Sequence, residues 1–115
     1  MTNTFELAHV GINNADATDA QELADLLCLM FNLDPRHGKK SEFAGTFFEC
    51  VRSQYLGTHG HIGMATADLP SAVEELTGKG FGFNAETAAY FDDGRLQNIY
   101  LAGEFGGFAI HVMQK

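Results

Sequence analysis

Three histidines and one glutamate in this 115-residue chain could bind a single metal ion. Two of the histidines, His9 and His61, each precede an aliphatic residue, a glycine and another apolar residue, so the pattern repeats after fifty-two residues. Glu49 lies in an apolar stretch between them, and His111 lies in the last apolar stretch of the chain. Imidazole and carboxylate groups suit a divalent ion of Zn, Ni, Co, Fe or Mn, and no thiolate belongs to the set. The residue types therefore predict a divalent metal site.

Apolar and polar residues alternate along the segments that carry these four residues, as expected for strands. The expected strands cover residues 5–13, two short stretches around Gly45 within 41–53, then 61–66, 96–101 and 108–113. The segment 81–90 is ambiguous between strand and loop. A turn at Asp93 and Gly94 separates it from the next strand.

Two amphipathic helices are expected between the strands. The first follows a capping box formed by Thr18 and Gln21. Its apolar stripe consists of Leu23, Leu26, Leu27, Met30 and Phe31. The second helix follows Asp68 and turns inward Leu69, Ala72, Val73 and Leu76.

The alternation assigns each candidate residue to a face of the sheet. The apolar residues expected to pack against the helices are Val10, Ile12, Phe48, Cys50, Ile62, Met64, Ile110 and Val112. His9, Glu49, His61 and His111 then project from the opposite face, which is concave if helices cover only one side. A lone histidine in a strand is more often a hydrogen-bonded structural residue, and Glu49 could lie on a solvated face. Their corresponding places in the two repeats favour a shared site that leaves positions for water or a bidentate substrate.

Length and composition indicate one domain over residues 1–115. The order of strand, helix and further strands repeats, which indicates two similar modules at about 1–56 and 57–115. The formal net charge of −8 argues against nucleic acid and anionic membranes as partners. Cys28 and Cys50 lie in apolar surroundings without metal-binding spacing, and neither a signal peptide nor a membrane-spanning stretch is visible. A reduced, cytoplasmic protein is therefore expected, and the metal site predicted above indicates a small-molecule substrate.

Other catalytic arrangements have less support. Neither GxxxxGK(S/T) nor GxGxxG occurs among the 13 glycines. A Cys–His nucleophile pair would need Cys50 on the cavity side, whereas its parity places it in the core. Arg52 and Arg95 could hold a substrate carboxylate, although exposed arginines are usually solvated. His37 and His59 are expected in turns or on the surface.

These features resemble the vicinal oxygen chelate superfamily, which includes glyoxalase I, bleomycin-binding proteins, methylmalonyl-CoA epimerase and extradiol dioxygenases. The similarity covers essentially the whole chain: paired βαβββ modules, His-Val-Gly-Ile from His9, His-Ile-Gly-Met-Ala-Thr-Ala-Asp from His61, and Gly-Gly-Phe-Ala-Ile-His-Val ending at Val112. The resemblance implies an α+β fold in which the modules form a curved mixed sheet, with helices outside and a concave metal or ligand cavity inside. It also implies the metal ligands His9, Glu49, His61 and His111.

The function implied by the resemblance is that of a glyoxalase-like lyase or isomerase, in which a small α-oxo or α-hydroxy carbonyl compound chelates a divalent ion. Metal-binding relatives usually carry Glu at the place of His111, so Glu49 is the remaining acidic candidate for a general base. Three alternatives stay open: a non-catalytic binding or resistance module, an Fe or Mn oxygenase, and an accessory module linked to 2-keto-3-deoxy-sugar-acid aldolase metabolism. A homodimer is expected, because edge strands and a half-open sheet favour pairing of subunits.

Overall fold

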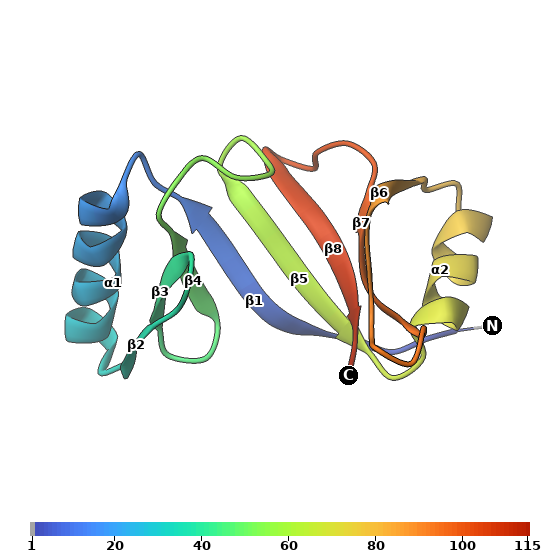
Figure 1. Cartoon of the computed structure of the whole chain (residues 1–115), viewed down its shortest axis with the longest axis horizontal. Coiled ribbons are helices and arrows are strands. Elements are labelled where there is room, and N and C mark those ends of the chain that lie inside the picture. Colours follow the sequence, from blue (N-terminus) through green and yellow to red (C-terminus); the bar gives the residue numbers. More distant parts are fainter. Residues whose placement is uncertain (1) are drawn as a thin grey trace.

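The fold is an eight-stranded mixed sheet with two helices, seen in a computed structural model that describes residues 2–115 (Figure 1). The helices are α1 (Ala17–Phe31) and α2 (Leu69–Gly78). The strands are β1 (Phe5–Asn13), β2 (Pro35–His37), β3 (Ser41–Ala44), β4 (Phe48–Val51), β5 (Gly60–Thr66), β6 (Phe83–Tyr90), β7 (Leu96–Leu101) and β8 (Phe108–Gln114). Their order across the sheet is β2-β3-β4-β1-β5-β8-β7-β6. The predicted α+β class and open curved sheet are confirmed.

Helix α1 begins after Asp16, whose carboxylate accepts a hydrogen bond from the backbone N–H of Asp19 (2.9 Å). The capping box predicted at Thr18 is therefore wrong by two positions, because Asp16 already satisfies a free N–H of the first turn. The helix ends at Phe31 and is C-capped by Asn32, which adopts the left-handed conformation with φ 56°.

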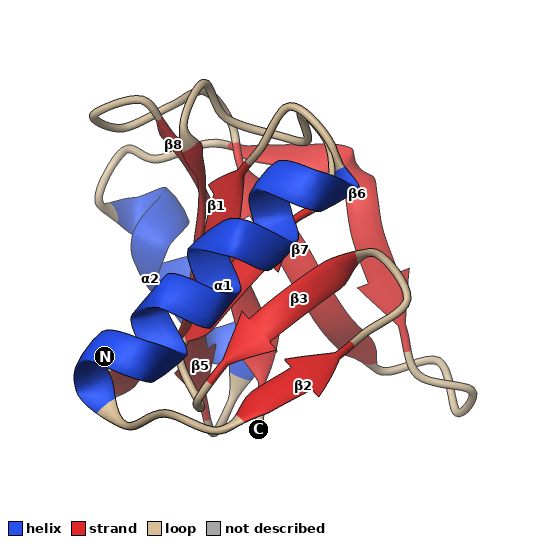
Figure 2. Ribbon diagram, turned by 90° about the vertical axis from the view of Figure 1, so that its left-hand side faces the viewer, coloured by secondary structure: helices blue, strands red, loops and turns tan. Residues whose placement is uncertain are grey.

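The buried face of α1 is centred on two alanines. Ala20 and Ala24 pack against Cys50 of β4, and Leu23 and Leu27 flank them. The small alanine side chains let the helix lie close against β3 and β4, and Figure 2 shows α1 running alongside β3. The core placement predicted for Cys50 is therefore confirmed, together with the inward direction of Leu23 and Leu27.

The rest of the stripe predicted on α1 is wrong. Leu26, Met30 and Phe31 are exposed by 53%, 58% and 61%, and Leu29 is exposed by 78%. The close approach at the two alanines rotates the helix so that these larger side chains point outward. An uncovered apolar surface on α1 is the result.

The second half of the chain follows the prediction more closely. Asp68 caps α2 by accepting a hydrogen bond from the N–H of Ser71 (3.1 Å), and Leu69 and Ala72 are fully buried. The ambiguous segment forms strand β6, which pairs antiparallel with β7. Strand β2 is the element that the sequence pattern does not predict, and it extends the other edge by pairing with β3. Within residues 2–115, neither helix has the length and apolar character needed to cross a bilayer.

The centre of the sheet is built from four strands with a defined register. Strands β1 and β5 are antiparallel, so that His9 lies opposite Gly63 and His61 lies opposite Gly11. Strand β4 runs parallel to β1 and places Glu49 beside Gly11. Strand β8 runs parallel to β5 and places His111 beside Gly63. The expected boundary near residue 57 falls between β4 and β5, and the division into two modules stays a prediction.

Candidate metal centre

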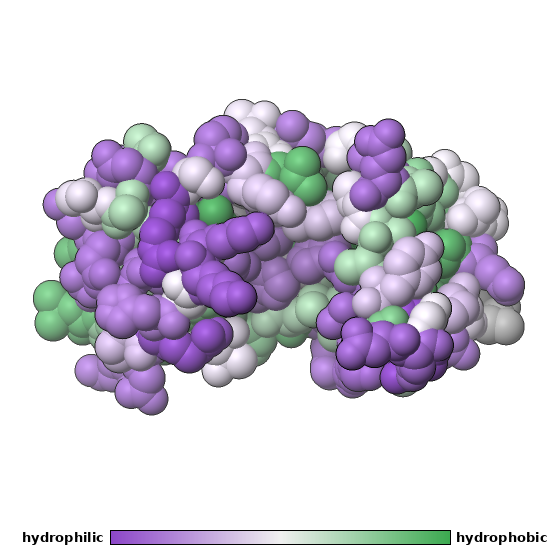
Figure 3. All heavy atoms as spheres, in the orientation of Figure 1, coloured by the Kyte–Doolittle hydropathy of each residue, from purple (hydrophilic) through white to green (hydrophobic). Residues whose placement is uncertain are grey.

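The structure brings all four predicted side chains together on one face of the central strands. Nε2 of His9 lies 3.0 Å from Nε2 of His111. Oε1 of Glu49 lies 3.2 Å from Nε2 of His61 and 3.7 Å from Nε2 of His9. One ring nitrogen from each histidine lies within 4.8 Å of the others. Figure 3 shows this face of the molecule hollowed at its centre, with hydrophilic residues in the hollow.

Two glycines leave the space that the imidazole rings fill. A Cβ atom on Gly11 would overlap the ring of His61. A Cβ atom on Gly63 would lie 2.7 Å from both His111 Nε2 and His9 Cε1. Each glycine of the repeated His-x-Gly motif therefore accommodates the histidine of the other copy. The spacing of the motif is visible in the sequence, but this use of it requires the strand register.

Three further residues hold the candidate ligands in place. Ser41 Oγ donates a hydrogen bond to Oε2 of Glu49 (2.7 Å). Nδ1 of His111 is hydrogen-bonded to Oδ1 of Asn98, and the ring of Tyr100 stacks on His111 with centroids 4.6 Å apart. Sequence reasoning missed all three residues. Asn98 and Tyr100 lie two residues apart on β7 and therefore share one face of the sheet. Strand β7 pairs with β8, which carries His111, so knowledge of that pairing would have identified both residues.

Burial and mutual contacts set the protonation states in the site. Burial, followed by the neighbouring His9 and His61, lowers the pKa of His111 to about 3. Burial and then His61 lower the pKa of His9 as well. A hydrogen bond from His61, supported by the one from Ser41, lowers the pKa of Glu49 to about 2. At neutral pH the imidazoles of His9 and His111 are therefore neutral, and Glu49 is ionised.

These protonation states fit a divalent cation. Because Asn98 Oδ1 accepts only, Nδ1 of His111 is the protonated nitrogen, and the Nε2 lone pair points into the cluster. Neutral nitrogens and a carboxylate oxygen that face one another repel unless a proton or cation lies among them. Nδ1 of His61 is buried and has no hydrogen-bond partner among residues 2–115, so packing over Gly11 positions its ring.

The cavity at the site has a volume of about 260 Å³. Its lining combines the four candidate ligands with five neighbours: Lys40, Ser41, Val51, Tyr55 and Tyr100. Neither arginine considered from the sequence belongs to it. Arg52 is bound to Glu42 and Arg95 is bound to Asp93 (2.8 Å), so both guanidinium groups have carboxylate partners elsewhere. Burial raises the pKa of the Cys50 thiol to about 11, which suits its place in the core.

Comparison with known proteins gives matches in structure and none in sequence. No family model matches the chain, and no curated protein sequence does. A hypothetical protein from Bacillus halodurans C-125 superposes with a TM-score of 0.64 at 12% identity, covering 97% of this chain and 95% of that one. Methylmalonyl-CoA epimerase from Streptomyces coelicolor, in complex with 2-nitronate-propionyl-CoA, superposes with a TM-score of 0.62 at 12% identity, covering 99% of both chains. That structure is of a variant of the epimerase. Another variant of the same enzyme superposes with a TM-score of 0.61 at 12% identity, covering 99% of this chain and 96% of that one.

Methylmalonyl-CoA epimerase is a member of the vicinal oxygen chelate superfamily. The chain has the vicinal oxygen chelate fold. The superposition confirms the predicted fold. Because the sequence identity is only 12%, the similarity establishes the fold alone. In this vicinal oxygen chelate fold the cavity lies over the central strands, where β1, β4, β5 and β8 each contribute one candidate ligand.

Replacing Ser41 by alanine is expected to weaken metal binding by about tenfold to a hundredfold, the usual effect of removing a residue that orients a ligand. Ser41 donates the hydrogen bond that fixes Oε2 of Glu49 and lowers its pKa. Competition with a chromophoric chelator measures the affinity. The exposed Ser53→Ala change is the control and should leave it unchanged. Equal affinities for the two variants would contradict the role assigned to Ser41.

Proposed function

We propose that this protein is a metal-dependent enzyme of the isomerase or lyase type, acting on a small α-oxo or α-hydroxy carbonyl compound. The observation that carries the proposal is the convergence of three imidazoles and one ionised carboxylate in a cavity. His9, Glu49, His61 and His111 would hold a divalent ion of Zn, Ni, Co, Fe or Mn. When bound, the ion would polarise a substrate carbonyl oxygen. The fold shared with an epimerase supports the reaction type.

The residues of the chain would position the substrate and move a proton. Glu49 is the acidic side chain in the cavity, and we propose it as a ligand and as the candidate general base. With a pKa of about 2 it is a weak base, so proton abstraction needs a C–H bond that is strongly acidified. Tyr55 and Tyr100 line the same cavity. Burial raises the pKa of Tyr100, so its phenol stays protonated and can donate a hydrogen bond.

Exchange of a substrate proton with deuterium tests this function. The protein, reconstituted separately with each of the five ions, is incubated in D₂O with small α-hydroxy and α-oxo carbonyl compounds. Loss of the NMR signal of the C–H protons next to a carbonyl group is then followed. We expect exchange with at least one ion and a loss of at least about a hundredfold in Glu49→Gln. Glu74, exposed on α2, provides the matched control Glu74→Gln, which should retain exchange.

Two other outcomes would redirect the assignment. Oxygen uptake by the Fe- or Mn-loaded protein would favour an oxygenase, which the same donor set also suits. Binding of these compounds without exchange for any ion would contradict the enzyme and favour a binding module.

We further propose a cytoplasmic homodimer. The two cysteines are free thiols, which suits a reducing compartment. Leu26, Leu29, Met30 and Phe31 form an exposed apolar surface on α1, and a second copy of the chain would cover it. Light scattering should give twice the chain mass of 12.5 kDa, and Leu29→Lys combined with Met30→Glu should give the monomer. An unchanged mass in that variant would place any dimer contact elsewhere, and a monomeric parent would contradict the dimer.

A further inference from the structure

Two lysines in a turn beside the cavity have no ion-pair partner among residues 2–115. Most of the seven basic residues have a carboxylate partner, in the pairs Arg52 with Glu42, Lys79 with Glu75, Arg95 with Asp93 and Lys115 with Glu6. Arg36 lies over the ring of Phe43, 3.9 Å from its centroid. Lys39 and Lys40 are the cations left over, and neither has an ion pair within residues 2–115. They are adjacent in the turn between β2 and β3, and Lys40 lines the cavity.

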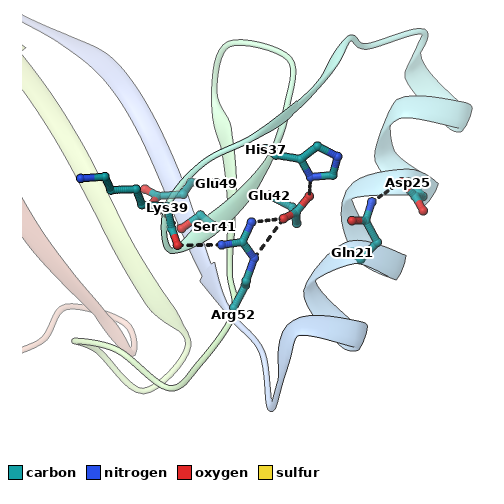
Figure 4. Close-up of polar contacts among 8 residues, drawn as sticks. All are labelled: Gln21, Asp25, His37, Lys39, Ser41, Glu42, Glu49 and Arg52. Carbon is teal, nitrogen blue, oxygen red and sulfur yellow. Dashed lines mark hydrogen bonds and ion pairs between the residues drawn. The ribbon is translucent and has the colours of Figure 1, made fainter.

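A buried ion-pair network holds this turn against β4. Glu42 exposes 6% of its side chain and is bound by Arg52 and by Nδ1 of His37 (Figure 4). Hydrogen bonds to Arg52 and then His37 lower the pKa of Glu42, so it stays ionised. Arg52 also donates from its guanidinium group to the carbonyl oxygen of Lys39 (2.8 Å) and from its backbone N–H to that of Lys40 (3.1 Å). The backbone from which both lysines project is therefore fixed.

The charge of the cavity differs from that of the whole chain. The net charge of −8 repels anions at long range. Within the site, neutral imidazoles and the single carboxylate of Glu49 would leave one positive charge on a divalent ion, and Lys40 adds another. Lys40 is the basic side chain among the residues that line the cavity, and no carboxylate within residues 2–115 pairs with it.

We infer that Lys40 binds a carboxylate or phosphate group of the substrate whose carbonyl oxygens chelate the ion. This inference rests on the proposed function and narrows its substrate class to anionic α-oxo or α-hydroxy compounds. Lys40 acts as a specificity residue, because it contacts a group that takes no part in the reaction. Ser41, the next residue, hydrogen-bonds Glu49, so the turn links recognition of the anion to placement of a candidate ligand.

Matched hydroxamate probes test the inference on the Co²⁺-loaded protein, with binding followed by the visible absorption of the ion. Acetohydroxamate is the uncharged probe; succinic monohydroxamate and its phosphonate analogue carry the same chelating group and an anionic tail. We expect one anionic probe to bind about tenfold tighter than acetohydroxamate, and the preferred tail identifies the group. Lys40→Met should remove this preference while leaving acetohydroxamate and Co²⁺ affinity unchanged. Lys40→Arg should restore part of it.

Lys39→Met is the control, because it changes the net charge equally from the neighbouring position. An equal loss in Lys39→Met and Lys40→Met would overturn a direct contact by Lys40 in favour of a general electrostatic effect. Equal affinity of the parent for all probes would overturn the inference while leaving the proposed function intact. Failure of the parent to bind Co²⁺ or any of the other four ions would overturn the proposed function, and the inference with it.

Discussion

Replacing both His61 and His111 by alanine is expected to abolish stoichiometric metal binding. The double variant removes two of the three converging imidazoles, one from β5 and one from β8. Loss of a residue that only orients a ligand weakens binding by about tenfold to a hundredfold, so losing two direct ligands should cost more than about a thousandfold. Inductively coupled plasma mass spectrometry of the tag-free proteins, before and after reconstitution, measures the change and identifies the ion.

The control for this variant removes two histidines outside the cavity. His37 is bound to Glu42 at the β2–β3 edge, and His59 packs against Gly107, so His37→Ala with His59→Ala should keep the ion. Circular dichroism separates loss of ligands from loss of fold. A parent that takes up no divalent ion after reconstitution would refute the proposed metal centre. Metal retained by His61→Ala/His111→Ala would place the binding site elsewhere.

The second large effect is expected from a single methyl group at Gly11. In Gly11→Ala the added Cβ overlaps the ring of His61, which exposes only 5% of its side chain and cannot move aside freely. Forcing an extra methyl into a packed interior costs about 1–3 kcal/mol. We expect the free energy of unfolding to fall by that amount, measured in urea, and metal content to fall because His61 is displaced.

Gly82→Ala is the matched control, since the nearest atom to its Cβ would be 3.9 Å away. Gly63→Ala should reproduce the loss of metal by displacing His9 and His111 instead of His61. Full metal occupancy in Gly11→Ala would show that the ring of His61 is free to shift, and would contradict positioning by packing.

Alternation along the strands was sufficient to predict which residues share the concave face. Side chains of a strand change face at every residue, so the parity of His9 against Val10 and of Glu49 against Cys50 follows from the sequence. The structure brings the four candidate side chains together, and their binding of a metal stays a prediction.

What the sequence could not provide depends on contacts between distant segments. The rotation of α1 is set by the packing of Ala20 and Ala24 on β4, and hydrophobic periodicity gives more weight to leucines than to alanines. The roles of Ser41 and Asn98 depend on strand pairing, which local pattern does not encode. The ion pair between Arg52 and Glu42 also depends on strand pairing.

The crossed pairing of His9 with Gly63 and of His61 with Gly11 corresponds to a half-turn rotation about an axis between Val10 and Ile62. Each half of the chain provides the space that a histidine of the other half fills, so one half alone cannot complete the cavity. The same rotation exchanges Glu49 with His111, where the two halves now differ. That departure from symmetry gives the cavity two chemically distinct sides, one with a carboxylate from β4 and one with an imidazole from β8.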